Sequence, residues 1–249
     1  MLTQERYQII LDRLNTYGAV TVAELAAELD ASESTIRRDL NALAKAGKLR
    51  KEFGGATSVK RMSGVDETRV SARELTMRAE KQRIARYAAE LVQDGDFVYI
   101  DSGTTTGFLA DYLHNLRATY VTNGVNIAHK LLYAGLPVYL IGGRIKPVTE
   151  AVVGAEGVRS LEGYHFTKAF IGTNGIDPEA GFTTPDIEEA RVKERAVRQS
   201  YTTFVLADST KFGRVYPVSF ARLGDCCIIT ERLPDSSFSE HTVIKEVTE

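Results

Sequence analysis

The chain has 249 residues, a formal net charge of −2, and 43% apolar against 26% charged side chains. These values are typical of a folded globular protein, and no apolar run reaches the roughly 20 residues that span a bilayer. The adjacent cysteines, Cys226 and Cys227, favour reduced thiols over a disulfide, and no His or Cys spacing indicates a metal site. We therefore expect a cytoplasmic protein without a metal, a cofactor or a membrane partner.

Positive charge is concentrated in one short segment of the chain. Residues 32–61 hold eight lysines and arginines against three acidic residues, a local charge of +5 that leaves −7 for the remainder. This asymmetry predicts a small basic module attached to a larger acidic body. We place the module at residues 1–57, a linker at 58–73 and the body at 74–249.

The basic module shows three helical patterns in succession. The first begins at Thr3, carries apolar residues at helical spacing, and ends at Gly18. Thr21 is expected to cap the second helix, and Ser32 the third, which ends at Gly47. Because only a few residues join the second helix to the third, the spacing predicts a helix-turn-helix.

The third helical pattern predicts a recognition helix. Ile36, Leu40 and Leu43 share its buried face, so the polar residues between them face outward or lie along its edges. Short hydroxyl side chains permit close approach to the major groove, and arginines reach guanine edges or phosphates. Asp39 is expected to pair with an arginine of the same helix. The predicted DNA contacts are Ser32, Ser34, Thr35, Arg37, Arg38 and Asn41.

A short basic hairpin is predicted after this helix. The sequences LRKEF and ATSV favour two strands, joined by a turn at Gly54-Gly55. Such a hairpin is a wing, and we expect Arg50 and Lys51 on it, beside the DNA backbone. A Ser/Thr-rich helix start or an arginine pair alone is usually a surface feature. Only in combination with the three helices, the tight turn and the local charge do these residues favour DNA binding.

From residue 74 onward, helical patterns alternate with apolar strands. Apolar strands separated by helices predict a mostly parallel sheet covered on both faces, which is a doubly wound α/β domain. Thr184 is expected to cap the last helix, which Pro185 begins. The predicted strands are 97–101, 119–123, 137–143, 168–175, 202–208 and 226–230. The predicted helices are 74–93, 106–116, 125–132, 154–161 and 185–200.

Small polar residues follow several of these strands. The sequence DSGTTTG, residues 101–107, opens a helix, and its backbone N–H groups suit a phosphate. By itself such a start is more often only a helix cap. Gly and Asn at three further strand ends imply a cleft that holds a small polar ligand. The candidate ligand residues are Asp101, Ser102, Gly103, Thr104, Thr105, Thr106, Asn123, Gly142, Gly143, Asn174, Asp177, Lys193 and Lys211.

Taken together, these motifs resemble the DeoR family of bacterial transcriptional regulators. TVAELAAELDASESTIRRDLNALAKAGKLRKEFGGAT is similar to its winged helix-turn-helix, although the family usually has Val-His where this chain has Glu52-Phe53, so we assign neither residue to DNA. DSGTTT, VTNG, IGG, FIGTNGI, GFTTPD and LADSTKF resemble its effector-binding domain, which is similar in fold to ribose-5-phosphate isomerase and coenzyme A transferases. The resemblance implies a phosphorylated sugar as effector, with its phosphate at Ser102–Thr106. The fructose-operon repressors are the most similar subgroup.

An isomerase-like cleft raises the alternative of an active enzyme. Isomerisation needs a general base, generally a carboxylate. By the resemblance, Asn174 stands where the isomerases have a catalytic aspartate and Lys193 near their glutamate, whereas Asp177 is retained. Glu188 or Glu189 could replace the base. We expect no catalytic residue, but an active sugar-phosphate isomerase or transferase with a DNA-binding domain stays an alternative, as does an adaptor that uses the winged helix for protein contacts.

The preferred hypothesis is a DNA-binding repressor of a sugar-utilisation operon. Its partners would be double-stranded operator DNA and a phosphorylated sugar that relieves repression, with fructose 1-phosphate as the candidate implied by the resemblance. Helix-turn-helix proteins bind two half-sites as symmetric dimers, because two modules multiply the affinity of one. We therefore expect a homodimer or a homotetramer.

Overall fold

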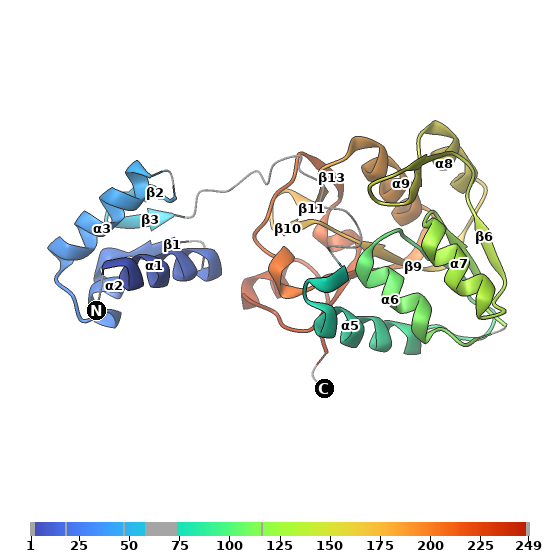
Figure 1. Ribbon diagram of the computed structural model, residues 1–249, viewed down its shortest axis with the longest axis horizontal. Helices are drawn as coiled ribbons and strands as arrows, with labels where there is room; N and C mark the ends of the chain where they lie inside the picture. The colour runs from blue at the N-terminus through green and yellow to red at the C-terminus, as the bar shows by residue number, and fades with distance from the viewer. Residues whose placement is uncertain (1–2, 18, 47, 58–73, 116, 248–249) are drawn as a thin grey trace. The chain divides into compact units, whose positions relative to one another are not determined.

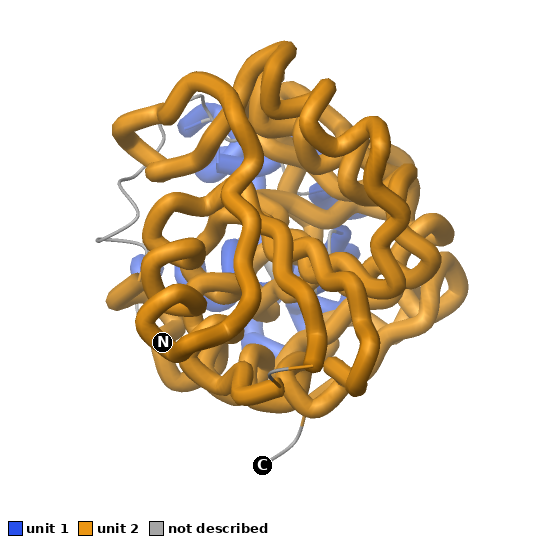
Figure 2. Tube along the Cα trace, turned by 90° about the vertical axis from the view of Figure 1, so that its right-hand side faces the viewer, with its two compact units in different colours: residues 1–61 blue, residues 62–249 orange. Residues whose placement is uncertain are grey.

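The computed structural model describes residues 3–17, 19–46, 48–57, 74–115 and 117–247. The chain divides into two compact units, residues 1–61 and 62–249, which are coloured separately in Figure 2. The predicted linker at 58–73 lies outside the described residues, and so do the helix ends predicted at Gly18 and Gly47. No helix within the described ranges is long and apolar enough to cross a membrane.

The first unit is a winged helix-turn-helix. Ile10, Leu25 and Ile36 come from its three helices and are at most 1% exposed, so the helices share one core. Thr21 and Glu24 form a capping box at the second helix, and Ser32 caps the third, as predicted. The elements are α1 (Thr3–Tyr17), β1 (Ala19–Thr21), α2 (Val22–Glu28), α3 (Glu33–Lys45), β2 (Arg50–Glu52) and β3 (Gly55–Thr57).

The wing differs from the sequence prediction in two respects. A third strand, β1, pairs with β3, so the sheet order is β1-β3-β2. The turn is Phe53-Gly54 and not Gly54-Gly55, because Gly55 pairs with Glu52 inside the ladder. Gly54 has a φ of +83°, which a glycine adopts without strain. A Cβ on Gly55 would lie 2.1 Å from the carbonyl oxygen of Val20, so this second glycine permits close strand packing instead.

The second unit is built on a seven-stranded sheet (Figure 1). Its order is β15-β14-β12-β9-β4-β5-β6, and every pairing is parallel. The strands are β4 (Phe97–Ile100), β5 (Thr119–Thr122), β6 (Val138–Leu140), β9 (Phe166–Gly172), β12 (Ser200–Leu206), β14 (Cys227–Thr230) and β15 (Ile244–Glu246). The helices are α5 (Arg78–Glu90), α6 (Thr104–Tyr112), α7 (Val125–Tyr133), α8 (Ala155–Leu161) and α9 (Ile187–Arg198).

Helices cover both faces of this sheet. Val98 and Ile100 of β4 belong to a core with α5, α6 and α7, whereas Tyr99 between them belongs to a core with α8 and α9. Successive strand residues point to opposite faces, so a strand that is apolar throughout is buried on both. The predicted doubly wound α/β domain is confirmed.

Short antiparallel strands that the sequence analysis did not predict lie beside this sheet. β7 (Arg144–Lys146) pairs with β8 (Ala151–Val153). β10 (Gly175–Asp177), β11 (Gly181–Thr184) and β13 (Val218–Ala221) form a second small sheet. Because Thr184 belongs to β11, it does not cap α9, and that prediction was wrong. Asp186 is the cap, since its carboxylate accepts the N–H groups of Glu188 and Glu189.

The chain reverses its direction across the sheet between β4 and β9. It proceeds from β4 outward through β5 to β6, and then returns to β9 on the other side of β4. In open α/β sheets, ligands bind beyond the carboxyl ends of the strands at such a switch point. Asp101 follows β4 and Gly172 ends β9, and the Asp101 N–H donates to the carbonyl of Phe170 at 2.9 Å. The two strand ends therefore define where a ligand site is expected.

Candidate DNA-binding surface and ligand cleft

The polar residues predicted to read DNA lie on the outside of α3. Ser34, Arg37, Arg38 and Asn41 are exposed, and Thr35 is half-buried. Arg37 pairs with Glu33 one turn earlier, at 2.9 Å between Nη2 and Oε2, and both side chains are more than half exposed. Arg38 forms no ion pair within the described ranges. Exposed pairs of this kind are weak, so both arginines can turn toward a phosphate or a base.

A cluster of hydroxyl groups marks the start of α3. The Oγ of Ser32 accepts the N–H of Thr35 at 3.2 Å, which makes Ser32 the helix cap. The same Oγ lies 2.8 Å from the hydroxyl of Ser34 and 2.9 Å from that of Thr35. Because a helix N-terminus attracts anions, this small polar cluster suits an approach to the DNA backbone.

Asp39 has a different partner from the one predicted. It is 3% exposed, and its carboxylate accepts hydrogen bonds from Arg6 of α1, at 2.8 Å from Nε and 3.3 Å from Nη2. The predicted pair within α3 was wrong, because Asp39 lies beside the buried Leu40 whereas Arg37 and Arg38 face outward. The ion pair instead ties α1 to the recognition helix.

The basic residues of the wing are exposed as well. Arg50 lies 3.3 Å from Glu52 between Nε and Oε1, and its side chain is 79% exposed. Lys51 is exposed on the same strand, and Phe53 stands free at the turn. The cations of the wing and those on the outer side of α3 are therefore all exposed.

A cleft of about 250 Å³ lies in the second unit, at the switch point between β4 and β9. It brings together many residues that are distant in sequence. The residues from the sequence prediction that line it are Ser102, Gly103, Thr104, Thr105, Asn174, Lys193 and Lys211. Lining residues outside that prediction are Thr76, Lys81, Gly172, Thr173, Pro185, Glu189, Leu206, Asp208, Thr210, Arg214 and Tyr216.

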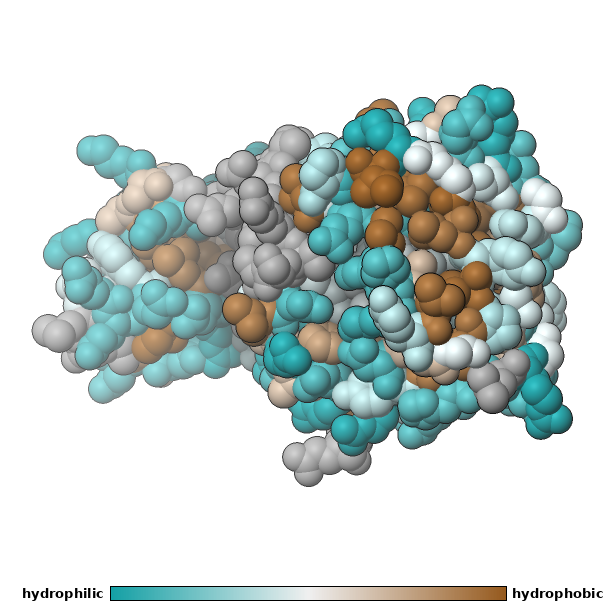
Figure 3. All heavy atoms as spheres, turned by 45° about the vertical axis from the view of Figure 1, so that its right-hand side comes forward, coloured by the Kyte–Doolittle hydropathy of each residue, from teal (hydrophilic) through white to brown (hydrophobic). Residues whose placement is uncertain are grey.

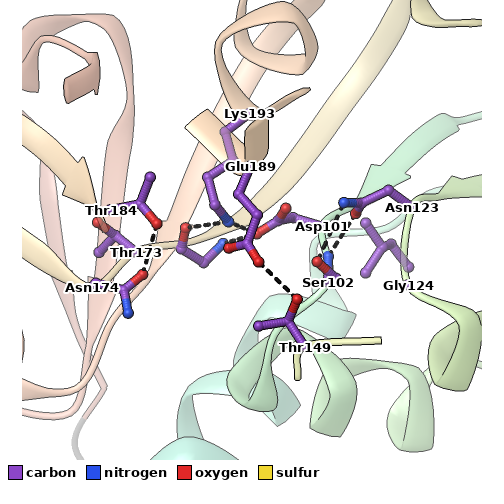
Figure 4. A network of polar contacts seen from close by, with 12 residues as sticks. Asp101, Ser102, Asn123, Gly124, Thr149, Thr173, Asn174, Thr184, Glu189 and Lys193 are labelled. Atoms are coloured by element: carbon purple, nitrogen blue, oxygen red, sulfur yellow. Dashed lines mark hydrogen bonds and ion pairs between the residues drawn. The ribbon is translucent and has the colours of Figure 1, made fainter. Parts of the chain in front are cut away.

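A buried ion pair forms the floor of this cleft (Figure 4). Asp101 is fully buried and Lys193 is 4% exposed, and they form a salt bridge through Nζ and Oδ2. Oδ2 also accepts the N–H of Gly172 at 2.9 Å, and Lys193 donates to the carbonyl of Gly172 at 3.1 Å. Burial raises the pKa of Asp101, while Lys193 opposes that shift. The pair joins the carboxyl ends of β4 and β9 to the middle of α9.

The loop between β4 and α6 is fixed by Asn123. Its Oδ1 accepts the N–H of Ser102 at 2.7 Å, and its Nδ2 donates to the Ser102 hydroxyl at 3.2 Å and to the carbonyl of Val152 at 3.3 Å. Asn123 therefore positions the loop and does not line the cleft itself. Gly103 takes the cap position of α6 without a side-chain cap, so the N–H groups at the start of the helix are not satisfied by a capping side chain.

The opposite wall of the cleft carries polar groups with fixed orientations. Asn174 accepts the Thr184 hydroxyl through Oδ1 at 3.0 Å. Glu189 is 8% exposed and accepts the Thr149 hydroxyl at 2.7 Å and the Lys146 ammonium at 3.4 Å. An amide is no proton acceptor for catalysis, and the Glu189 carboxylate is held in an ion pair. These groups are arranged to bind a polar ligand.

Two cations of the cleft have no acidic partner within the described part of the chain. Lys211 and Arg214 line the cavity, and neither forms an ion pair with any residue that the structure describes. Lys81 also lines the cleft and is only 3% exposed. It shares a helix face with Ile84 and Ala85, so a lysine at an apolar helix position was the signal that could have identified it.

Three further predicted ligand residues, Asp177, Gly142 and Gly143, do not line the cleft. The carboxylate of Asp177 accepts the N–H groups of Glu179 and Ala180, both at 3.0 Å, and so closes the turn between β10 and β11. Gly142 and Gly143 follow β6 and are not among the lining residues. A Cβ on Gly143 would lie 2.8 Å from a methyl group of Val152, so this glycine serves packing. We no longer assign these three residues to ligand binding.

No group of three or more His, Cys, Asp or Glu side chains in the described part of the chain is arranged to hold a metal ion.

Two buried oxygens near the cleft, Oδ1 of Asp101 and Oγ1 of Thr106, have no hydrogen-bond partner among the residues that the structure describes.

Comparisons with known proteins agree with both halves of the molecule. A model described as the DeoR-like helix-turn-helix domain matches residues 6–62, and one described as the DeoR C terminal sensor domain matches residues 76–232. The chain belongs to the DeoR family. It is a transcriptional regulator with a DNA-binding unit and a sensor unit.

Full-length relatives share this arrangement. The sequence is 40% identical to the uncharacterized HTH-type transcriptional regulator FruR of Bacillus subtilis, over 99% of each chain. It is 33% identical to the HTH-type transcriptional repressor GlcR of the same organism, over 96% of this chain and 93% of the relative. A lactose phosphotransferase system repressor of Staphylococcus aureus is 35% identical over 90% of each.

Among solved structures, ribose 5-phosphate isomerase A of Methanocaldococcus jannaschii matches with a TM-score of 0.42 and 15% identity. The match covers 55% of each chain.

Proposed function

We propose that this DeoR-family regulator represses a sugar-utilisation operon and is released from its operator by a phosphorylated sugar. The observation that carries the proposal is the cleft at the switch point, which combines a helix N-terminus with two cations, Lys211 and Arg214, that no acidic side chain of the described residues neutralises. The names of two relatives, a lactose phosphotransferase system repressor and FruR, support a sugar signal. We take fructose 1-phosphate as the candidate effector and the cytoplasm as the site of action.

The phosphate would bind at the start of α6. Backbone N–H groups at a helix N-terminus stabilise a phosphate, and a glycine before them lets the backbone approach it closely. Thr104 and Thr105 are the first residues of the helix, and both line the cleft. Lys211 and Arg214 would balance the charge of the phosphate. The hydroxyl groups of the sugar would face Asn174 and Glu189 on the opposite wall.

Operator binding would use the exposed residues of α3 and the wing. The N-terminal half of α3 would enter the major groove, and Arg50 and Lys51 would contact the backbone beside it. A dimer or a tetramer would place two such units on two half-sites. Effector and operator would then favour different conformations of the assembly, and a coupling of about 1–3 kcal/mol between two sites is typical.

Thr76 and Lys81 are positioned to transmit the signal. Both line the cleft, and both lie within ten residues of the predicted linker at 58–73. An effector that contacts them would change the start of α5, which begins at Arg78. We propose that this is how occupation of the cleft reaches the DNA-binding unit.

The test is Thr105→Glu, which places a carboxylate where the phosphate would bind. The variant should bind operator DNA normally but fail to release it when a sugar phosphate is added, because like charges repel in the cleft. Thr105→Val is the matched control, since it keeps the volume without adding charge, and it should still respond. A Thr105→Glu protein that binds the sugar phosphate with unchanged affinity would contradict the proposed phosphate site.

A further inference from the structure

One edge of the seven-stranded sheet in the sensor unit has no neighbouring strand among the described residues. β6 is the last strand of the seven-stranded sheet, and it pairs only with β5 among the strands that the structure describes. An edge strand presents N–H and C=O groups that another strand can bind. The outer edge of β6 therefore suits a partner that binds to it as an extended strand.

Large apolar side chains surround this edge. Tyr139 of β6 is 59% exposed, and Tyr133 at the end of α7 is 85% exposed. Figure 3 shows apolar residues gathered on the face of the sensor unit that is turned toward the viewer. Large apolar side chains exposed on and beside an edge strand favour an interaction surface. We call it the edge surface and define it by the exposed residues Leu132, Tyr133, Tyr139, Leu140 and Ile145.

Charged residues bordering the edge surface are already paired within the chain. Arg144, next to Ile145, forms an ion pair with Glu188 of α9. Lys146 pairs with Asp186 at 2.9 Å, and Lys130 of α7 pairs with Asp111 at 2.9 Å. These three cations therefore do not call for an oppositely charged partner. A partner that also has exposed apolar side chains beside a free strand edge fits this surface best.

We propose that a second copy of this chain covers the edge surface, with the two β6 strands antiparallel about a two-fold axis at Tyr139. This geometry is self-complementary, because Val138 of one copy lies opposite Leu140 of the other and Tyr139 lies opposite itself. The two sheets become continuous, and each copy buries its apolar residues against the same set. The inference rests on the proposed function, because a reader of two half-sites needs two winged helices.

The register predicts a disulfide between two copies of one cysteine variant. Directly opposed residues in an antiparallel pair have Cα atoms about 4.5–5.5 Å apart, within the range that a disulfide bridges. Tyr139→Cys, made in a Cys227→Ser background because native Cys227 is partly exposed, should form a covalent dimer under mild oxidation. Tyr201→Cys is the matched control. It is 93% exposed and lies outside the edge surface, and it should stay uncrosslinked.

A second measurement does not depend on cross-linking. Sedimentation of the full-length protein without DNA should give a mass of at least two chains, and Leu140→Asp combined with Tyr139→Asp should halve it. Tyr201→Asp should leave it unchanged. A monomeric wild type, an assembly that survives the double variant, or equal cross-linking from Tyr201→Cys would overturn the proposal. A dimer of the predicted mass that fails to bind an operator contradicts the proposed function and leaves this interface intact.

Discussion

Charged residues are exposed where the first unit is proposed to bind DNA, whereas several are buried at or below the ligand cleft of the second unit. In the DNA-binding unit the cations predicted to meet DNA, among them Arg38 and Lys51, lie on the surface. In the sensor unit Lys81, Asp101 and Lys193 are each at most 4% exposed and lie at or below the ligand cleft. An extended polyanion is bound by many exposed cations, and salt weakens that binding. A small ligand needs a few groups whose positions are fixed before it arrives, because there is less surface with which to offset the cost of ordering them.

This difference determines what a substitution should do in each unit. Removing an exposed cation changes DNA affinity and leaves the folded unit nearly as stable as before. Removing one partner of a buried pair leaves a charge without compensation in a medium of low polarity, which destabilises the fold. The same type of residue therefore reports on function in one unit and on stability in the other.

The largest effect is expected from Asp101→Asn. The substitution leaves the buried Lys193 without its counter-charge and should lower the free energy of unfolding of the sensor unit by about 3–5 kcal/mol. Asp94→Asn is the matched control. It removes the partner of Arg117 in an exposed pair and should cost about 1 kcal/mol or less. Urea unfolding measures the free energy of unfolding of both variants. Equal losses would show that the contribution of an ion pair to stability does not depend on its burial here.

Arg37→Ala and Arg38→Ala should each weaken operator binding by about 1–3 kcal/mol if the side chain reads a base. The free energy of unfolding should hardly change, because both side chains are exposed. Fluorescence anisotropy with operator and unrelated DNA at several salt concentrations separates the two kinds of contact. An equal loss on both DNAs, with a smaller salt dependence, would indicate a phosphate contact. Unchanged affinity in the double variant would refute the assignment of α3 as the recognition helix.

The smallest effect is expected from Asp186→Asn and concerns pH. Burial would raise the pKa of Asp186, but hydrogen bonds from Lys146 and from the N–H groups of Glu189 and Glu188 lower it below the ordinary value of 3.8. A lowered folded-state pKa stabilises the protein above that value, and the contribution is lost as pH falls through the folded-state pKa. Asparagine keeps the helix cap without the charge.

The Asp186→Asn protein should therefore be less stable than wild type at pH 7, by about 1 kcal/mol or less, and its stability should fall less between pH 5 and pH 3. Urea midpoints across that range measure the slope. Parallel curves for the two proteins would mean that the charge of Asp186 does not contribute to folding.

The features that sequence predicted well depend on residues close together in the chain. Thr21 and Ser32 cap their helices through groups three residues away, and the apolar strands identify a sheet buried on both faces. Features that depend on packing were missed. Asp39 pairs with Arg6, thirty-three residues away, and Arg214 reaches the cleft from a segment without periodicity. Likewise, only the folded chain distinguishes Asn123, which positions the loop, from the residues that line the cleft.

The central claim is that an anion in the cleft of the sensor unit releases DNA from the other unit. It is tested most directly by titrating fructose 1-phosphate and unphosphorylated fructose into a complex of the protein and its operator at fixed salt. We predict release by fructose 1-phosphate and none by fructose, because fructose has no anion for the start of α6. Release by a different sugar phosphate alone would change the identity of the effector and keep the mechanism. Equal release by fructose and its phosphate would contradict the claim.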